Sequence, residues 1–331
     1  MARPRPAAAP PRQSGAALSI GLSAAIVAAN ADEPRVLTIR LAGGALDALP
    51  SGPLEPEHRT LEIGLRTWVE RQTSQRLGHV EQLYTFGDRD RAAGDKALAL
   101  PALVVAYLAL VREARPAGAA EAEWQSWYRY FPWEDWRGGK PALLGAIEAG
   151  LARWAARAAG DDLRRLREER LGLVFGLSGA AWNEELALDR YELLYEAGLV
   201  AEAARDVGHA AAAGGDAFTG MAMASDHRRI LATAIGRLRG KIKYRPVVFE
   251  LMPPSFTLSQ LQQTVEALAG IRLHKQNFRR LVEQQGLVEE TGEISAATGG
   301  RPARLVRFRR EVLLERPAPG LRLRAGRRAA G

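Results

Sequence analysis

Residues 256–288 read FTLSQLQQTVEALAGIRLHKQNFRRLVEQQGLV, and their pattern predicts the structure of the C-terminal part of the chain. Thr257 is a good N-cap for a first helix. Apolar residues then recur on one helical face, at Leu258, Leu261, Val265 and Leu268. Gly270 ends this helix, and a short turn leads to a second one, from Leu273 to Gln285, with Gly286 just beyond its end. Two helices joined by a tight turn predict a helix-turn-helix unit.

The residues that follow predict a wing. Leu287 and Val288 start a strand, residues 291–300 form a link rich in glycine, threonine and serine, and residues 301–308 form a second strand. Two strands around a loop after a helix-turn-helix unit make a winged helix. We therefore predict a winged helix over residues 246–315, followed by a basic disordered tail over residues 316–331.

The second helix presents side chains suited to reading DNA. At about 100° per residue, the side chains of Phe278, Leu281, Val282 and Gln285 cluster near one direction. The candidate DNA-binding residues of the helix face away or flank it: Lys275, Gln276, Asn277, Arg279 and Arg280. Arginine matches guanine, and asparagine or glutamine matches adenine, in the major groove. Around the wing, Arg301 and Arg304 can neutralise phosphates. The alternative is a winged helix that binds protein, with a merely solvated charged surface.

Charge is distributed unevenly along the chain. The 331 residues carry a net charge of +8, yet residues 226–331 hold 21 Lys and Arg against 9 Asp and Glu, a net +12. The preceding residues are slightly acidic. A chain of this length predicts two domains. A positive charge concentrated on the predicted winged helix favours double-stranded DNA as its partner.

Cysteine and histidine usage excludes several kinds of site. The chain has no cysteine, which removes disulfides, thiolate zinc sites and cysteine nucleophiles. Its five histidines are scattered without the spacing of metal ligands. We therefore predict no metal site.

The N-terminus has two interpretations. Residues 1–15 are rich in Ala, Pro and Arg and are predicted to be a disordered tail. Residues 16–31 are small and apolar after three arginines, which imitates a secretory signal. The interpretation we favour is a hairpin, with strands at 18–28 and 36–41 around a turn at 30–34. No run of about 20 strongly apolar residues is present, so no membrane span is expected, and we expect a cytoplasmic protein.

The middle of the chain alternates strand and helix patterns. Strands are predicted at 80–86 and 98–111, and a helix at 226–243. Residues 124–136 contain seven aromatic side chains, which could stack on a ligand's base but more often form core. Residues 141–225 are predicted to be a helical insertion, rich in Ala, Leu, Arg and Glu. Within it, Asp162, Leu163, Leu166, Glu169 and Arg170 predict an amphipathic helix, and residues 191–199 predict another.

Residues 52–73 resemble the Nudix box, the loop, helix and loop that hold divalent metal on a diphosphate. The residues that match are Gly52, Arg66, Trp68 and Glu70. His58, Thr67 and Arg71 stand where acids are needed, and Thr73 replaces the closing glycine. Magnesium and manganese need a set of hard carboxylate oxygens, so hydrolysis is not expected and no catalytic residue is assigned.

A diphosphate can still bind without metal near this box. His58, Arg66 and Arg71 offer donors where metal would supply charge, and Glu70 and Trp133 complete our candidate effector site. The alternative for this helix is that it has no binding role and is an exposed helix stabilised by ion pairs between residues four positions apart. The enzymatic alternative is an active Nudix hydrolase of ADP-ribose or a related nucleoside diphosphate, using Glu57, Glu62 and Glu70.

Several motifs together resemble the Nudix-related transcriptional regulators of the NrtR type. They are residues 256–261, 277–280, 286–288 and 299–304, preceded by 226–227 and 237–241. The insertion and the His58 to Glu62 form of the box are most similar to the NadQ branch. The resemblance implies an α+β fold, in which a Nudix-like α/β sandwich with a helical insertion (residues 16–245) precedes the winged helix-turn-helix domain.

The same resemblance implies a function. Such regulators repress genes of NAD biosynthesis or salvage, form homodimers and respond to an adenine nucleotide effector such as ADP-ribose, NAD or ATP, with no cofactor required. We expect the effector near the box and the aromatic segment 124–136. Its binding would shift the two winged helices of a dimer through the helix 226–243. A third alternative is a nucleotide-responsive interaction protein that binds no DNA.

Overall fold

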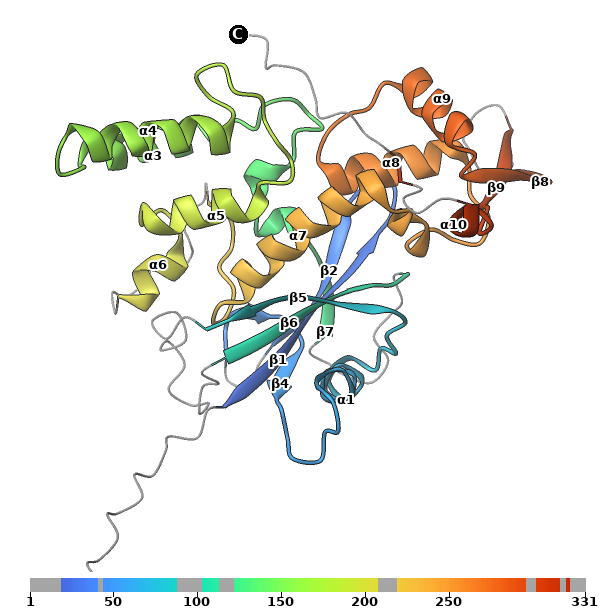
Figure 1. Cartoon of the computed structure of the whole chain (residues 1–331), viewed down its shortest axis with the longest axis horizontal. Coiled ribbons are helices and arrows are strands. Elements are labelled where there is room, and N and C mark those ends of the chain that lie inside the picture. The colour runs from blue at the N-terminus through green and yellow to red at the C-terminus, as the bar shows by residue number, and fades with distance from the viewer. Residues whose placement is uncertain are drawn as a thin grey trace, which may run out of the picture.

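The structure, a computed structural model, describes residues 19–40, 44–87, 103–112, 122–207, 219–295, 302–315 and 320–321. It has an α+β architecture in which one mixed sheet is followed by helices and then by a winged helix (Figure 1). Within these residues, no helix has the length and apolar character needed to cross a membrane. Disordered tails are expected at 1–15 and 316–331; apart from residues 320 and 321 they lie outside the described residues, as does Arg301. Leu321 departs from that expectation, because it is buried and its N–H donates to the carbonyl of Ile242 at 3.1 Å.

Within the described residues, the sheet has seven strands, and its main path runs β3-β2-β1-β6-β5. The strands are β1 (Ile20–Ala29), β2 (Pro34–Arg40), β3 (Asp47–Ala48), β4 (Ser51–Pro53), β5 (Val80–Phe86), β6 (Leu103–Leu110) and β7 (Ala122–Ser126). β4 pairs with β1 and β7 with β2. β1 and β6 are parallel and lie at the centre of the sheet, which explains their nearly continuous apolar sequences.

The predicted N-terminal hairpin is confirmed. β1 and β2 pair antiparallel, with Val27 opposite Val36. The turn is held by Asn30, whose side-chain oxygen accepts hydrogen bonds from the backbone N–H groups of Asp32 and Glu33, each at 2.9 Å. β1 is buried along almost its whole length, which fits a central strand. The strands at 80–86 and within 98–111 are also confirmed, although residues 98–102 are not described.

Two separate apolar cores cover the two faces of the sheet. Helix α1 (Leu61–Thr73) packs on one face through Leu65 and Val69, against Leu22 and Ile26 of β1. The other face carries residues 127–136 of the aromatic segment and helix α7 (His227–Tyr244), whereas Trp124 packs against the core on the α1 side. Successive side chains of β1 point to opposite faces, so the strand contributes to both cores.

Most of the aromatic segment is core, and its two short 3-10 helices are η1 (Trp127–Arg129) and η2 (Pro132–Glu134). Four of its side chains are fully buried: Trp127, Tyr130, Phe131 and Trp133. Phe131 and Trp133 meet edge to face, with ring centroids 5.8 Å apart. The structural explanation of this cluster is therefore confirmed.

The predicted insertion contains α3 (Leu144–Ala156), α4 (Asp161–Phe175), α5 (Ala187–Glu196) and α6 (Ala201–Asp206). α3 and α4 pack side by side and form an arm at one end of the molecule (Figure 1). Leu166 on α4 is 60% exposed, so the apolar stripe of this helix is only partly covered. The helix predicted at 226–243 is confirmed as α7.

After a 3-10 turn, η3 (Val247–Glu250), the C-terminal part forms a winged helix. Its elements are α8 (Leu258–Ala269), α9 (Lys275–Gln285), β8 (Val288–Ser295), β9 (Ala303–Phe308) and α10 (Val312–Glu315). Thr257 and Gln260 form a complete capping box at the start of α8, and Gly270 ends it with a φ of 72°. The helix-turn-helix prediction is confirmed.

One boundary in the wing was predicted wrongly. Residues 291–295, assigned from their composition to the linking loop, continue strand β8. The strand tolerates Gly292 at a φ of 81° because its pairing with β9 shifts register between Glu290 and Ile294. Pairing to a neighbouring strand therefore overrides the turn preference of this glycine-containing sequence.

Candidate functional site

Helix α9 exposes a polar face. Phe278 and Val282 are buried beneath it, as the helical spacing predicted. Four of the candidate DNA-binding residues are exposed on it: Lys275, Gln276, Asn277 and Arg280. Arg279 is half-buried instead of facing fully outward. Within the described part of the chain, Lys275, Arg279 and Arg280 make no ion pair, so their charges are available to a nucleic acid.

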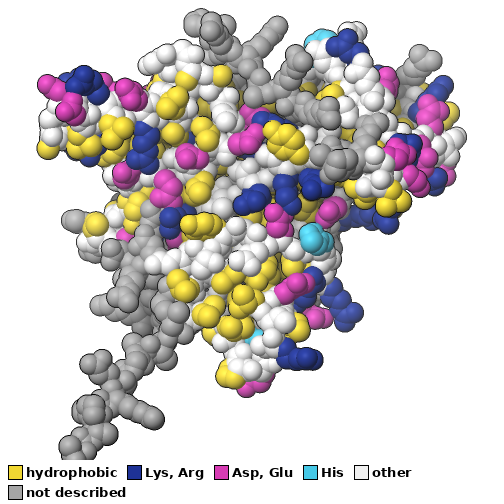
Figure 2. Space-filling model, in the orientation of Figure 1, with side chains coloured by type: hydrophobic (Ala, Val, Ile, Leu, Met, Phe, Trp, Pro, Cys, Tyr) yellow, Lys and Arg dark blue, Asp and Glu magenta, His cyan; other side chains and the backbone are white. Residues whose placement is uncertain are grey.

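The wing arginines are paired with acids on the neighbouring strand. Arg304 of β9 lies 2.6 Å from a carboxylate oxygen of Glu290, and Arg307 lies 2.6 Å from Glu289. Figure 2 shows acidic and basic side chains interspersed over this end of the molecule. A phosphate that contacts Arg304 therefore competes with Glu290, although the pair is exposed and worth little by itself.

The structure explains two of the box residues that match. Gly52 lies against the indole of Trp68, since a Cβ atom at residue 52 would stand 2.2 Å from that ring. The indole N–H of Trp68 donates to the carbonyl of Pro53 at 2.8 Å. The pair joins β4 to α1. Thr60 caps α1 by accepting from the N–H of Ile63 at 3.1 Å.

Arg66 is 33% exposed, and all three nitrogens of its guanidinium bond to its own domain. Its Nε donates to Glu62 at 2.9 Å, its Nη2 donates to the carbonyl of Gly78 at 2.6 Å, and its Nη1 donates to the carbonyl of Leu77. The guanidinium thereby fixes the loop after α1. Arg66 thus has a structural role. A diphosphate that contacted Arg66 would have to bind it alongside these hydrogen bonds.

The other box residues divide into buried and exposed ones. The His58 side chain is 7% exposed and its Nδ1 accepts from the N–H of Glu55 at 3.1 Å, so it shapes the loop before α1. Arg71 is exposed and lies over the indole of Trp68, 4.8 Å from the ring centroid. Glu70 is exposed and pairs with Arg76 at 3.1 Å. Among the described residues, no group of three acidic or histidine side chains is arranged to hold a metal ion.

Trp133 has to be removed from the candidate effector site. Its side chain is fully buried in the core that contains α7, whereas α1 packs in the core on the opposite face of the sheet. The sheet therefore separates Trp133 from His58, Arg66 and Arg71. Trp124 of the aromatic segment, by contrast, packs against the core on the α1 side of the sheet.

A buried ion network, which the sequence did not indicate, lies beside Trp133. The carboxylate of Glu134 accepts hydrogen bonds from Arg190 of α5 and from Arg239 of α7, and all three side chains are fully buried. Burial alone would raise the pKa of Glu134, but the two guanidiniums outweigh it and hold that pKa below its usual value. Arg190 lies 56 residues and Arg239 lies 105 residues from Glu134 in the sequence, so no local sequence pattern reveals the network.

The network borders the contact between the sheet domain and the winged helix. The Nε of Arg239 donates to the carbonyl of Leu268 at 3.0 Å, and the Tyr128 hydroxyl donates to that of Ala267 at 2.6 Å. The N–H of Trp136 donates to the carbonyl of Gly270 at 2.7 Å. Three bonds thus attach the C-terminal end of α8 to the sheet domain, which is a route by which one domain positions the other.

Comparisons with known proteins agree with this architecture. Residues 248–308 match the NrtR DNA-binding winged helix domain. An ADPR responsive transcriptional repressor, NtrR, from Acinetobacter baylyi is 44% identical over 86 residues, which are 26% of this chain and 34% of that protein. The aligned region therefore spans about a third of the relative's length.

Two crystal structures share the overall fold. Shewanella oneidensis NrtR in complex with a 27mer DNA matches with a TM-score of 0.52 and 19% identity, over 88% of this chain and 94% of that chain. A MutT/nudix family protein from Enterococcus faecalis matches with a TM-score of 0.51 and 16% identity, over 91% of this chain and 90% of that one. Residues 248–308 therefore form a winged helix of the NrtR type, and the chain as a whole has the fold of the Nudix-related regulators of that type.

Proposed function

We propose that this protein is a nucleotide-responsive transcriptional repressor whose Nudix-like domain senses a ligand without hydrolysing it. The observation that carries the proposal is the face of α9, where Lys275, Arg280 and two amide side chains are exposed on an NrtR-type winged helix. Basic and amide side chains together suit phosphates and base edges. By family resemblance, the regulated genes are those of NAD biosynthesis or salvage.

The proposed effector is an adenine nucleotide, with ADP-ribose first and NAD or ATP as alternatives. The name of the Acinetobacter relative, which includes responsiveness to ADPR, supports ADP-ribose. No cofactor is required in this proposal, and the protein acts as a homodimer on a two-fold symmetric operator. Helix α7 connects the two domains, and Arg239 on this helix contacts both Glu134 and α8.

We propose that the box does not hydrolyse its ligand, because its side chains are unsuited to binding a divalent metal ion. Thr67 donates to the carbonyl of Ile63 on its own helix, and Arg71 places a cation where the Nudix pattern has an acid. The carboxylate of Glu62 forms an ion pair with Arg66, and the carboxylate of Glu70 forms one with Arg76. Two carboxylates that are both paired with arginines are poor ligands for a divalent ion.

A gel shift with the DNA upstream of the protein's own gene tests the DNA part of the proposal. Specific binding is expected, with an affinity that falls steeply as salt rises, because several phosphates are contacted. Adding ADP-ribose, NAD or ATP should change that affinity, and the family precedent favours release. A protein that binds neither this DNA nor random duplex at low salt is instead an interaction protein.

Release of phosphate or AMP from ADP-ribose with magnesium or manganese tests the enzymatic alternative. No turnover is expected. Turnover that disappears in Glu70→Gln would establish a hydrolase and overturn the inactive sensor. Glu123→Gln is the matched control, since Glu123 is exposed on β7, far from α1 in the chain.

A further inference from the structure

The positive charge of residues 226–331 lies mostly outside the winged helix itself. Residues 246–315 hold nine lysines and arginines against eight acids, a net +1. Residues 226–245 hold seven against one, a net +6, and residues 316–331 hold five arginines and no acid, a net +5. The positive charge that favours DNA as a partner is therefore divided between α7 with its caps and the end of the chain.

The charge of α7 is largely neutralised within the protein. The helix has six lysines and arginines, and each pairs with an acid from another element. These pairs are Arg228 with Glu202, Arg229 with Glu192, Arg237 with Glu81, Arg239 with Glu134, Lys241 with Glu81, and Lys243 with Glu184. The cations of α7 thus hold the sheet domain and the insertion together, and little of their charge is left for an outside partner.

The winged helix also pairs many of its own cations. Four of its arginines form ion pairs with acids of the same domain: Arg272 with Glu266, Arg304 with Glu290, Arg307 with Glu289, and Arg309 with Glu315. Among the described residues, Lys275, Arg279, Arg280 and Arg310 form no ion pair. Four cations are few, because half or more of the hydrogen bonds in a protein–DNA interface go to phosphate and sugar.

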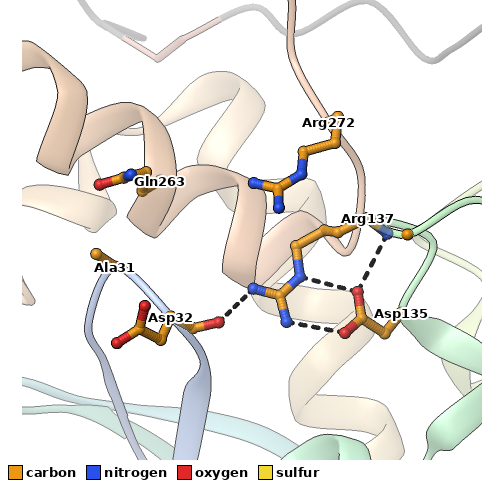
Figure 3. Close-up of a pocket in the computed structure, with 7 residues that line it drawn as sticks. Ala31, Asp32, Asp135, Arg137, Gln263 and Arg272 are labelled. Carbon is orange, nitrogen blue, oxygen red and sulfur yellow. Dashed lines mark hydrogen bonds and ion pairs between the residues drawn. The ribbon is translucent and has the colours of Figure 1, made fainter.

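The junction between the two domains adds no positive surface. A pocket there is lined by Arg137 and Arg272 and also by Asp32 and Asp135, so its charges balance (Figure 3). Arg137 lies 2.8 Å from a carboxylate oxygen of Asp135. Further phosphate contacts therefore have to come from another part of the chain.

The end of the chain starts from a fixed point on α7. Leu321 is fully buried, and its N–H donates to the carbonyl of Ile242 at 3.1 Å. Carbonyls in the last turn of a helix have no partner within the helix, so this bond satisfies one of them. Gly320 lies directly on the helix end, since a Cβ atom there would stand 2.3 Å from the carbonyl carbon of Tyr244. The anchor is four residues before the winged helix begins.

We propose that residues 322–331, which we call the arginine tail, are a second DNA-binding element that supplies phosphate contacts the winged helix lacks. The proposal rests on the proposed function and concerns the same partner, double-stranded DNA. The tail contains four arginines and no acid: Arg322, Arg324, Arg327 and Arg328. Guanidinium groups bind phosphate bidentately, and arginines in short terminal arms also enter the minor groove.

The arginine tail is long enough for this role. Ten extended residues span at most about 35 Å. Helix α8, with twelve residues, is about 18 Å long. A tail that starts at the end of α7 can therefore reach DNA bound anywhere along the winged helix. Anchoring at Leu321 keeps the arginines near that DNA, which raises their effective concentration.

Fluorescence anisotropy with the full-length protein, at several salt concentrations, tests the arginine tail. The test variant carries Arg322→Gln, Arg324→Gln, Arg327→Gln and Arg328→Gln together. At low salt it should bind specific and random duplexes at least tenfold more weakly, by the same factor, because phosphate contacts carry no sequence information. The slope of log affinity against log salt should become shallower by about 2–4, since up to four phosphate contacts are lost.

A charge-matched control separates local contacts from the overall charge of the protein. It replaces four exposed arginines of α3, α4 and the turn between them by glutamine: Arg153, Arg157, Arg164 and Arg165. These helices lie at the other end of the molecule from the wing (Figure 1). The control should keep the salt slope of the parent protein and change affinity by less than about threefold.

Gly320→Val tests the anchor without changing any charge. The valine side chain collides with the backbone of Tyr244, so the tail should detach from α7 and both duplexes should bind several-fold more weakly. Circular dichroism checks that the rest of the fold is kept. Parent affinity in a folded Gly320→Val protein would show that anchoring has no part in DNA binding.

The outcomes distinguish failure of the arginine tail from failure of the proposed function. If the parent protein binds the specific duplex, and the four-arginine variant matches it or loses no more than the control, the tail proposal is overturned and the repressor proposal stands. If the parent binds only random duplex, and the four-arginine variant loses that binding, the tail is supported although operator recognition fails. No binding of either duplex by the parent protein overturns both.

Discussion

Arg190 holds both carboxylate oxygens of Glu134, with its Nε 2.5 Å from Oε1 and its Nη2 2.9 Å from Oε2. Neither side chain has any exposed surface. The pair joins α5, within the predicted insertion, to η2, and Arg239 extends it to α7. At least one role of the insertion is therefore structural: it supplies a cation to a carboxylate buried beside the domain junction.

Replacing Arg190 by Met should lower the free energy of unfolding by about 3–5 kcal/mol, because a buried carboxylate loses one of its two cations. Urea denaturation followed by circular dichroism measures the change. Arg165→Met, which removes an exposed ion pair, should change it by less than about 1 kcal/mol. Equal losses in the two variants would contradict the assigned role of the buried pair.

Stability should depend on pH through His227. Burial, with a smaller contribution from Arg205, lowers the pKa of His227 to about 4. Its Nδ1 accepts from the N–H of Leu49 at 3.1 Å and must stay unprotonated. The unfolded chain binds this proton more readily, so stability is complete above about pH 6.5 and falls as pH drops toward 4, by up to about 3 kcal/mol.

The measurement for His227 is the free energy of unfolding at several pH values between 7 and 4. His227→Gln should flatten the curve over that interval, since the amide oxygen can accept the same bond without titrating. His79→Gln, at an exposed position, should keep the slope of the parent protein. A His227→Gln curve with the parent slope would show that other groups cause the dependence.

Gly52→Ala should destabilise the protein by about 1–3 kcal/mol, because the new methyl group would overlap the Trp68 indole and the site is already filled. Gly78→Ala is its control, since nothing lies within 4 Å of a Cβ built at residue 78. Thermal unfolding compares the two, and Trp68 fluorescence reports the displaced ring. A Gly52→Ala protein as stable as Gly78→Ala would mean that the indole can move at no cost.

The face of α9 should determine which DNA sequence is bound. Truncating Arg280 to Ala should cost about 1–3 kcal/mol on the specific site and relax discrimination at one base pair. Arg304→Ala should weaken all sequences similarly, because a phosphate contact carries no sequence information. Fluorescence anisotropy with specific and random duplexes measures both. If Arg279→Ala, Arg280→Ala and Arg304→Ala lose the same amount on both duplexes, α9 is not the recognition helix.

The wing offers a further test with the opposite sign. Glu290→Gln should raise affinity for every duplex, since it frees Arg304 from its ion pair and removes a negative charge near the DNA. The same anisotropy assay at two salt concentrations measures the gain, which should shrink as salt rises. No gain at low salt would indicate that Arg304 does not contact phosphate.

Local sequence patterns were enough to predict most of the individual helices and strands. Helices α7, α8 and α9 follow from apolar spacing, from the Thr257 cap and from the glycines that end α8 and α9, all of which act within a few residues. The first hairpin follows from Asn30 and its turn. The faces of α9 also follow, because helical geometry alone puts Phe278 and Val282 opposite Gln276 and Arg280.

Which side chains lie together could be learned only from the packing of distant segments. Trp133 and Arg66 are separated by a sheet whose strand order no local pattern encodes. Glu134 finds Arg190 and Arg239 through burial, where a charge persists only with partners from distant segments. Arg137 and Arg272 meet because the end of α8 docks on the segment after η2, and this contact is a property of packed domains rather than of any one stretch of chain.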